Sequence, residues 1–397
     1  MNQATLDYIH RHAAEDVRQL ALRGTHNPEV QLSYALEQIA GRQKAQSKLP
    51  SWAAIDDIIY PPHLSMEQCS SELTARYKAS IAGQGIRVVD LTAGFGVDIA
   101  FISQAFREAV HVERQQELCA VSSANYQLLG LQHIEVVCGD GVEYLHQMAH
   151  ADLIFIDPAR RDEHGSRTYG IADCTPNVLE IIDEMLEKVD RVMLKLSPML
   201  DWRKAVQDLG KVSEVHIVSV DNECKELLII VNSDVQPIKV GCVNLLSNGS
   251  KEVFEFNDGD SGHSNLSSPT PYSPLSMNHY LYVPNASIMK AGCFEQLRQR
   301  FGITQLDKNS HLFVSDTDIS DFPGRQFIIE RTSSMNKREL KAALEGITKA
   351  NLAVRNFPMS VAELRKRLKL KEGGDVYIFA TTVAGEGHQL LVCRKKS

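Results

Sequence analysis

Acidic residues and glycines follow one apolar run of this sequence in an order that could hold a nucleotide-like ligand. The run 87–91 contains Asp90 and leads into a turn of small residues that includes Gly94 and Gly96. An apolar strand ending in an acid, then a glycine turn, then an apolar helix is typical of a loop that binds an adenosine-containing ligand. Ile99 stands where a dinucleotide-binding loop has its third glycine, which disfavours NAD.

Two further acids come after the next apolar runs. Glu113 lies 23 residues after Asp90, near the spacing of about 20 at which a carboxylate binds ribose hydroxyls in dinucleotide sites. Asp140 lies in a Cys-Gly-Asp-Gly sequence after the third run. Because parallel sheets bind ligands at the carboxyl ends of their strands, the three acids should meet at one edge. Alternatively, Glu113 and Asp140 cap the helices that follow or stabilise turns.

The elements that must position these acids alternate between strand and helix. Strands separated by helices of 10–15 residues imply right-handed crossovers and a mostly parallel sheet covered on both faces. Only six residues separate the last two strands, so these should form an antiparallel hairpin at one edge. The expected strands are 87–91, 109–113, 134–138, 153–156, 191–195, 215–220 and 227–231, and the main helices are 115–129, 176–188 and 201–209.

Composition bounds the class of protein. The chain has 397 residues, 43% of them hydrophobic and 23% charged, which suits a multidomain protein. No apolar run reaches about 18 residues and the amino terminus is charged throughout, so a cytoplasmic location without membrane contact is expected. The eight cysteines are scattered singly, without the spacing of a zinc site, which predicts reduced thiols and no metal.

The region 87–231 resembles the class I S-adenosylmethionine-dependent methyltransferases. The resemblance implies S-adenosyl-L-methionine as cofactor. Asp90 would hold its methionyl amino group, and Gly94 and Gly96 would let the backbone approach the adenosine, with Thr92 at a position where many members have another glycine. It also assigns Glu113 to the ribose and Asp140 to the adenine edge. One glycine loop alone leaves a structural role or another nucleotide as alternatives.

The fourth strand ends in Asp157-Pro158-Ala159-Arg160-Arg161. Nitrogen-directed members of the family have an acid or Asn, two prolines and an aromatic here, so the resemblance implies a catalytic role for Asp157 and Pro158. The aromatic is missing, and Arg160 or Arg161 would instead stack on a base or bind phosphate; alternatively, they pair with nearby acids. No cysteine adjoins Pro158, which disfavours covalent methylation of a pyrimidine carbon.

Two weaker candidates follow the fifth strand. Lys195-Leu-Ser-Pro198 ends that strand and either faces the ligand or only forms a turn. The segment 223–226, between the last two strands, is expected to be a solvated loop.

The carboxyl-terminal third resembles a THUMP-like domain that follows a methyltransferase domain in a bacterial family. The similarity rests mainly on residues 350–382, and the segment 282–292 is similar to a ferredoxin-like unit of the same family. THUMP domains bind RNA, so the resemblance implies an RNA partner such as tRNA. The charge agrees: residues 331–371 hold eleven Lys and Arg against three Glu, although the whole chain carries −8. Arg365, Lys366 and Arg367 are the expected phosphate contacts, or else the solvated face of an amphipathic helix.

These observations predict an α/β protein with a Rossmann-like seven-stranded methyltransferase sheet, an amino-terminal helical region and small α+β carboxyl-terminal domains. The expected boundaries are 1–82 (helical region, with Ser65 as N-cap of a helix after Pro62), 83–236 (methyltransferase), 237–276 (strand pair and linker), 277–325 (ferredoxin-like) and 326–397 (THUMP-like). The leading hypothesis is methylation of a structured RNA at a base nitrogen. The alternatives are an RNA-binding protein whose methyltransferase fold has lost catalysis, and a methyltransferase acting on protein or a small molecule.

Overall fold

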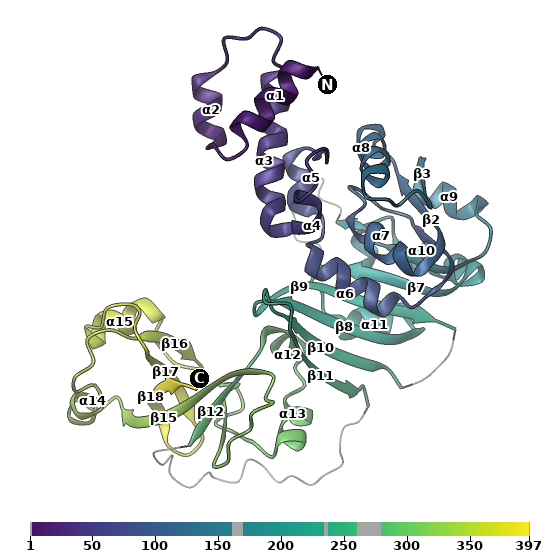
Figure 1. The fold of residues 1–397 in the computed structure, drawn as a ribbon. Coiled ribbons are helices and arrows are strands. Elements are labelled where there is room, and N and C mark those ends of the chain that lie inside the picture. Colours follow the sequence, from purple (N-terminus) through teal and green to yellow (C-terminus); the bar gives the residue numbers. More distant parts are fainter. Residues whose placement is uncertain (1, 161–169, 234–236, 260–278, 397) are drawn as a thin grey trace. The chain divides into compact units, whose positions relative to one another are not determined.

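A computed structural model describes residues 2–160, 170–233, 237–259 and 279–396 of the chain. These residues form two compact units (Figure 1). Unit one contains Met1–Val220 and Lys225–Ile238, and unit two contains Asp221–Cys224 and Lys239–Ser397. Among the described residues, no helix combines the length and the apolar character that a membrane crossing requires.

Unit one begins with six helices. The first three pack around a small core of their own that includes Tyr8, Leu20 and Ile39. A helix begins directly after Pro62 as predicted, but Ser65 is not its N-cap, because it lies inside this helix, which starts at His63. The helix ends before Cys69, and Ser71 caps the next one by accepting from the Thr74 amide. The helices are α1 (Gln3–His12), α2 (Val17–Arg23), α3 (Leu32–Lys48), α4 (Pro50–Ala53), α5 (His63–Gln68) and α6 (Glu72–Ala82).

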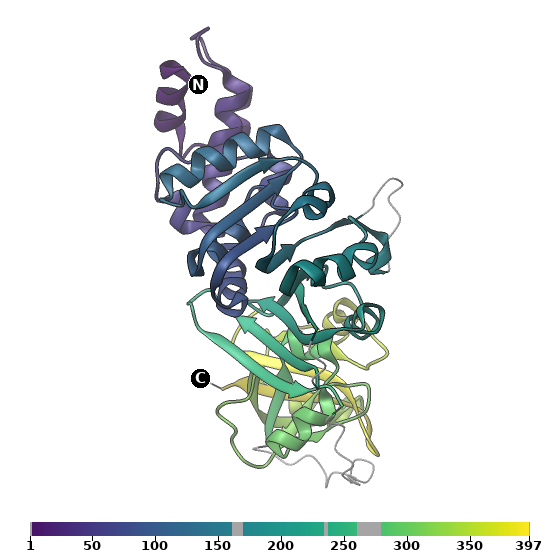
Figure 2. The ribbon, with the colours of Figure 1, turned by 90° about the vertical axis from the view of Figure 1, so that its right-hand side faces the viewer.

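The remainder of unit one is built on seven strands that lie side by side in the order β8-β9-β7-β4-β1-β2-β3. Figure 2 shows the blue and teal strands among these, with helices beside them. Strands β3, β2, β1, β4 and β7 run parallel, and β9 runs antiparallel to β7. The predicted Rossmann-like sheet is therefore confirmed. The strands are β1 (Gly85–Asp90), β2 (Phe106–Glu113), β3 (Ile134–Cys138), β4 (Ala151–Ile156), β7 (Val189–Leu196), β8 (Val212–Val220) and β9 (Glu223–Asn232).

Helices connect these strands and bury their apolar faces against the sheet. Every residue of α7 (Val97–Ile102) is buried, because this short helix directly follows the glycine turn and packs against α6. A 3-10 turn (Ser103–Ala105) then leads to β2. A two-residue pair, β5 (Ala159–Arg160) with β6 (Cys174–Thr175), lies beyond β4. The other helices are α8 (Gln116–Leu128), α9 (Gly141–Gln147), α10 (Val178–Lys188) and α11 (Trp202–Leu209).

Unit two contains the antiparallel hairpin β10 (Lys239–Leu245) and β11 (Lys251–Asn257) and a seven-stranded sheet in the order β13-β14-β12-β15-β18-β17-β16. The linker expected after the hairpin falls mostly outside the described residues. The sheet strands are β12 (Tyr280–Pro284), β13 (Thr304–Gln305), β14 (Phe313–Ser315), β15 (Gly324–Ser334), β16 (Asn351–Arg355), β17 (Val376–Val383) and β18 (Gly387–Lys395). The helices are α12 (Ala286–Ala291), α13 (Phe294–Phe301), α14 (Lys337–Ala343) and α15 (Val361–Leu368).

Candidate functional site

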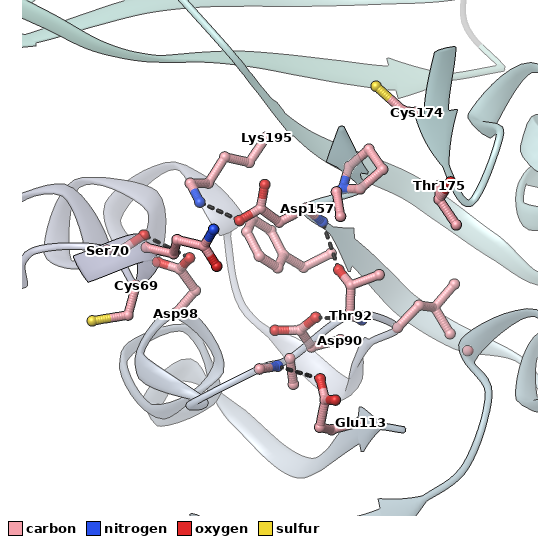
Figure 3. Close-up of a pocket in the computed structure, with 18 of the residues that line it drawn as sticks. Cys69, Ser70, Asp90, Thr92, Asp98, Glu113, Asp157, Cys174, Thr175 and Lys195 are labelled. Carbon is pink, nitrogen blue, oxygen red and sulfur yellow. Dashed lines mark hydrogen bonds and ion pairs between the residues drawn. The ribbon is translucent and has the colours of Figure 1, made fainter. Parts of the chain in front are cut away.

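A cavity of about 670 Å³ opens at the carboxyl ends of the parallel strands of unit one (Figure 3). Its volume is in the range of about 300–1,000 Å³ that is usual for small-molecule sites. The linker between α5 and α6 closes one side of it with Cys69 and Ser70. The predicted site residues Asp90, Thr92, Gly94, Gly96, Glu113, Asp140, Asp157 and Pro158 all line this cavity.

The glycine turn is supported from beneath by two buried side chains. Gly96 has φ of 80° and begins α7, and Gly94 has φ of 56°. The hydroxyl of Tyr126 donates to the Gly96 carbonyl at 3.2 Å and lies 2.8 Å from His111 Nδ1. Burial lowers the pKa of His111 to about 3, so its ring is neutral. The turn therefore requires glycine at position 96 for its backbone angle and for the space that Tyr126 occupies.

Asp90 is almost fully buried at the end of β1, with 1% of its surface exposed. Its Oδ1 accepts from the Thr92 amide at 3.0 Å, and the Thr92 hydroxyl in turn accepts from the Asp157 amide at 2.7 Å. Burial raises the pKa of Asp90 well above its usual value, and the neighbouring carboxylates of Asp98 and Asp157 raise it further. A cation bound beside Asp90 would favour its ionised form.

Glu113 and Asp140 also line the cavity and already accept backbone hydrogen bonds. Glu113 accepts from the Gly94 amide at 3.0 Å and from the Gln115 amide at 2.8 Å. Asp140 caps α9 by accepting from the amides of Val142 and Glu143 at 2.8 and 3.2 Å. The capping and turn roles that the sequence offered as alternatives are thus present. Binding of ribose by Glu113 and of adenine by Asp140 stays a prediction.

Asp157 forms an ion pair with Lys195, a residue that the sequence indicated only as a weaker candidate. The ammonium of Lys195, at the end of β7, donates to Asp157 Oδ2 (Figure 3). Burial alone would lower the pKa of Lys195, but the carboxylates of Asp157, Asp98 and Glu226 outweigh it and raise the pKa above its usual value. Lys195 therefore stays charged and cannot serve as a base.

A buried ionic cluster lies behind the cavity wall. Lys78 of α6 has no exposed surface, and its Nζ donates to both Glu226 oxygens at 2.9 and 2.7 Å and to Ser70 Oγ at 3.1 Å. Asp98 Oδ1 lies 3.1 Å from the same ammonium without hydrogen-bond geometry, and its Oδ2 accepts from Ser70 at 2.8 Å. The expected solvated loop at 223–226 is therefore wrong: these residues begin β9, and Glu226 is 3% exposed.

The ammonium groups of Lys78 and Lys195 partly neutralise the acids around the cavity. Burial raises the pKa of Glu226, and the ammonium groups of Lys78 and Lys195 oppose that rise. Four carboxyl groups (Asp90, Asp98, Asp157 and Glu226) lie near these two ammonium groups, and a bound cation would favour the ionised form of Asp90, whose pKa burial raises. The cavity thus suits a ligand that carries positive charge.

The basic candidates do not join this cavity in the part of the chain that the structure describes. Arg161 lies outside the described residues, and of Arg160 only the backbone, paired with Cys174, is described. Arg365, Lys366 and Arg367 lie on α15 in unit two, where Leu364 faces the core and Lys366 and Arg367 are exposed. The solvated helix face considered from the sequence is therefore present, and their role toward RNA stays a prediction.

Two cysteines line the cavity, and no motif in the sequence pointed to either. Cys174 comes from β6, and Cys69 from the segment between α5 and α6. Burial raises the pKa of Cys69 to about 11, which keeps it a thiol and unsuited to nucleophilic attack. Over the described ranges, His, Cys, Asp and Glu form no group of three or more that could hold a metal ion.

Three family models match the chain in succession. The model of protein-L-isoaspartate(D-aspartate) O-methyltransferases matches residues 62–162, a ferredoxin-like domain model matches 280–323, and a THUMP domain-like model matches 324–395. A crystal structure of a proposed methyltransferase from Porphyromonas gingivalis W83 is 32% identical, with a TM-score of 0.87, and covers 99% of this chain and 98% of that one.

Two curated proteins match only part of unit one. Protein-L-isoaspartate O-methyltransferase from Thermotoga maritima is 30% identical over 76 residues, which are 18% of this chain and 24% of that protein. The enzyme of the same name from Nitrobacter winogradskyi is 32% identical over 77 residues, which are 19% of this chain and 36% of that protein. The chain thus spans about a quarter and about a third of the length of these two relatives.

Proposed function

Because the chain belongs to the class I methyltransferases that carry ferredoxin-like and THUMP-like domains, we propose that it transfers the methyl group of S-adenosylmethionine to a nitrogen of a structured RNA such as tRNA. The observation that carries the proposal is the cavity at the strand ends, lined by the glycine turn and by the buried carboxyl group of Asp90. Methyl transfer from a sulfonium is an in-line displacement that needs no metal, and most of its rate comes from holding donor and acceptor close together.

The proposed cofactor site is built on Asp90 and the glycine turn that follows it. Asp90 would accept from the methionyl ammonium, Gly94 and Gly96 would leave room for the adenosine, and Glu113 and Asp140 would face the ribose and the adenine. The cofactor carries an ammonium, a sulfonium and a carboxylate, and its net positive charge suits a cavity lined by the carboxyl groups of Asp90, Asp98 and Asp157. Thr92 holds the Asp90 and Asp157 loops together, and Asp157 and Pro158 would border the accepting atom.

Asp90→Asn is expected to weaken S-adenosylmethionine binding about 10- to 150-fold, because a hydrogen bond to a charged group contributes about 1.5–3 kcal/mol. In the unaltered protein, affinity should rise with pH, since burial raises the pKa of Asp90 and the ionised form binds the ammonium. Asp90→Asn should lose that pH dependence. Isothermal titration measures both, with exposed Asp57→Asn as the control; unchanged affinity for Asp90→Asn would refute the assignment.

The proposal that the substrate is an RNA rests on the positive charge of part of unit two. Eleven basic residues against three acidic ones between 331 and 371 suit a polyanion. We choose Lys366 and Arg367 to test it, because both are exposed, whereas Arg365 also donates to the Ala350 carbonyl at 3.2 Å.

Lys366→Glu with Arg367→Glu should weaken RNA binding and lower the slope of log affinity against log salt by about 2, one for each phosphate that the variant no longer neutralises. A gel-shift titration at several salt concentrations measures the slope. Arg11→Glu with Arg18→Glu is the matched control, since both residues are exposed on α1 and α2. Equal slopes for the two double variants would exclude this surface as the RNA-binding face.

A transfer assay separates the alternatives. The full chain is incubated with methyl-labelled S-adenosylmethionine and an extract of cells that lack the protein. Label that ribonuclease releases and protease does not is the expected result. Label released by protease would favour a protein substrate, the alternative suggested by the isoaspartate methyltransferase match at 62–162. Label in small molecules would favour the other substrate class, and cofactor binding without transfer would favour a fold that has lost catalysis.

A further inference from the structure

Asp157 and Lys195 place a hydrogen-bond acceptor beside a cation in the cavity, where we expect the substrate to meet the methyl group. Asp157 and Lys195 both line the cavity, from the neighbouring strands β4 and β7. The side chain of Asp157 is 36% exposed and that of Lys195 is 14% exposed, so both can reach a ligand. Lys195 engages Oδ2 of Asp157, and among the described residues none donates to Oδ1, which can therefore accept from a substrate.

Neighbouring residues fix the backbone at Asp157 and keep Lys195 charged. The Thr92 hydroxyl accepts from the Asp157 amide at 2.7 Å and so fixes the loop after β4. Around Lys195, the carboxylates of Asp98 and Glu226 supplement Asp157 and keep the ammonium charged. The site therefore presents an ammonium beside the Asp157 carboxylate, where a ligand in the cavity can reach both groups.

This charge discriminates between two kinds of nitrogen. When a neutral amine takes a methyl group from a sulfonium, positive charge develops on the nitrogen, and a neighbouring ammonium opposes it. When a lactam nitrogen takes the methyl group and loses its proton, negative charge develops on the adjacent carbonyl oxygen. An ammonium placed beside that oxygen stabilises it.

We propose that Asp157 and Lys195 select a lactam edge, the N–H and C=O pair of guanine or uracil, as the methyl acceptor. The lactam N–H donates to Asp157 and the carbonyl accepts from Lys195. This inference rests on the proposed function and names its substrate class.

The step balances without a further reactant. The lactam nitrogen forms a bond to the methyl carbon, and the bond from that carbon to sulfur breaks, its electron pair staying on sulfur as the neutral thioether. The N–H proton passes to the Asp157 carboxylate. Lys195 keeps its protons throughout and offsets the charge on the carbonyl oxygen.

The test identifies the methylated atom. The full chain is incubated with S-adenosylmethionine and total small RNA from cells that lack the protein, and the nucleosides are compared with synthetic standards by mass spectrometry. Methylation at N1 of guanosine or N3 of uridine is expected. Methyl groups on a nitrogen of adenosine or cytidine, on a carbon or on a ribose oxygen would overturn the lactam proposal while leaving RNA methylation intact. No transfer to any RNA would overturn both.

Two variants test Lys195 as a positioning and charge-stabilising residue. Lys195→Met should lower kcat about 10²- to 10³-fold, the usual effect of removing one such donor, with little change in the Kd for S-adenosylmethionine. Lys195→Arg keeps a cation and should recover part of kcat. Thermal unfolding checks that both variants are folded, and equal kcat values for the two would then overturn the role of the charge. If Lys195→Met does not fold, Lys195→Arg alone provides the test: methylation of adenosine or cytidine by this variant would overturn the role of the charge.

Discussion

Lys78→Met should lower the free energy of unfolding by about 3–5 kcal/mol, the usual cost of removing one partner from a buried ion pair. The ammonium has no exposed surface and contacts Glu226, Asp98 and Ser70. Its removal leaves two buried carboxylates without their nearest cation. Denaturant unfolding of the full chain, followed by a signal from unit one, measures the change.

The loss should depend on pH. In the variant, the pKa of Glu226, which burial already raises, rises further, so the folded state takes up a proton more readily than the unfolded state. The deficit in unfolding free energy should therefore be largest near neutral pH and shrink as pH falls toward the ordinary glutamate pKa of about 4.3. Lys44→Met is the control, because its pair with Glu67 is 43% and 42% exposed and contributes about 0–1 kcal/mol. Equal losses for both variants would contradict the buried cluster.

Gly96→Ala is expected to destabilise unit one by about 2–5 kcal/mol and to abolish measurable cofactor binding. A Cβ at this position would lie 2.0 Å from Tyr126 Oη and 2.9 Å from His111 Nδ1, and both groups are buried. Overpacking and a positive φ each cost about 1–3 kcal/mol. Thermal unfolding and isothermal titration measure the two effects.

Gly94→Ala provides the matched control for this prediction. Its φ of 56° carries a similar backbone cost, but a Cβ there would meet nothing within 4 Å. The stability loss should therefore stay near about 1–2 kcal/mol. If Gly94→Ala and Gly96→Ala are equally destabilised, the contact with Tyr126 does not constrain the turn.

The strand ends of unit one were predictable because each strand is a short apolar run and the connections dictate a parallel sheet. Asp90, Glu113, Asp140 and Asp157 follow from that topology, since the carboxyl ends of the strands meet at one edge. Local capping was harder. Ser65 and Ser71 both precede helical patterns, but α5 already begins at His63, so only Ser71 stands at the start of a helix.

The ionic cluster could not be predicted, because its members are far apart in the sequence. Lys78 and Glu226 are separated by 148 residues, and Lys195 by 38 from Asp157. A lone lysine on a helix or at a strand end usually faces solvent. The charge of Lys78 is satisfied because the fold brings α6 next to Glu226 of β9 in the same unit, and hydrophobic periodicity does not predict such a contact.

The nucleoside content of RNA from cells with and without the protein tests the central claim most directly. Total RNA from both cell types is digested and its nucleosides are quantified by mass spectrometry. We predict that one methylated nucleoside, formed on a base nitrogen, is lost in the absence of the protein and returns when the full chain is restored. Identical nucleoside contents in all three samples would contradict RNA methylation by this protein.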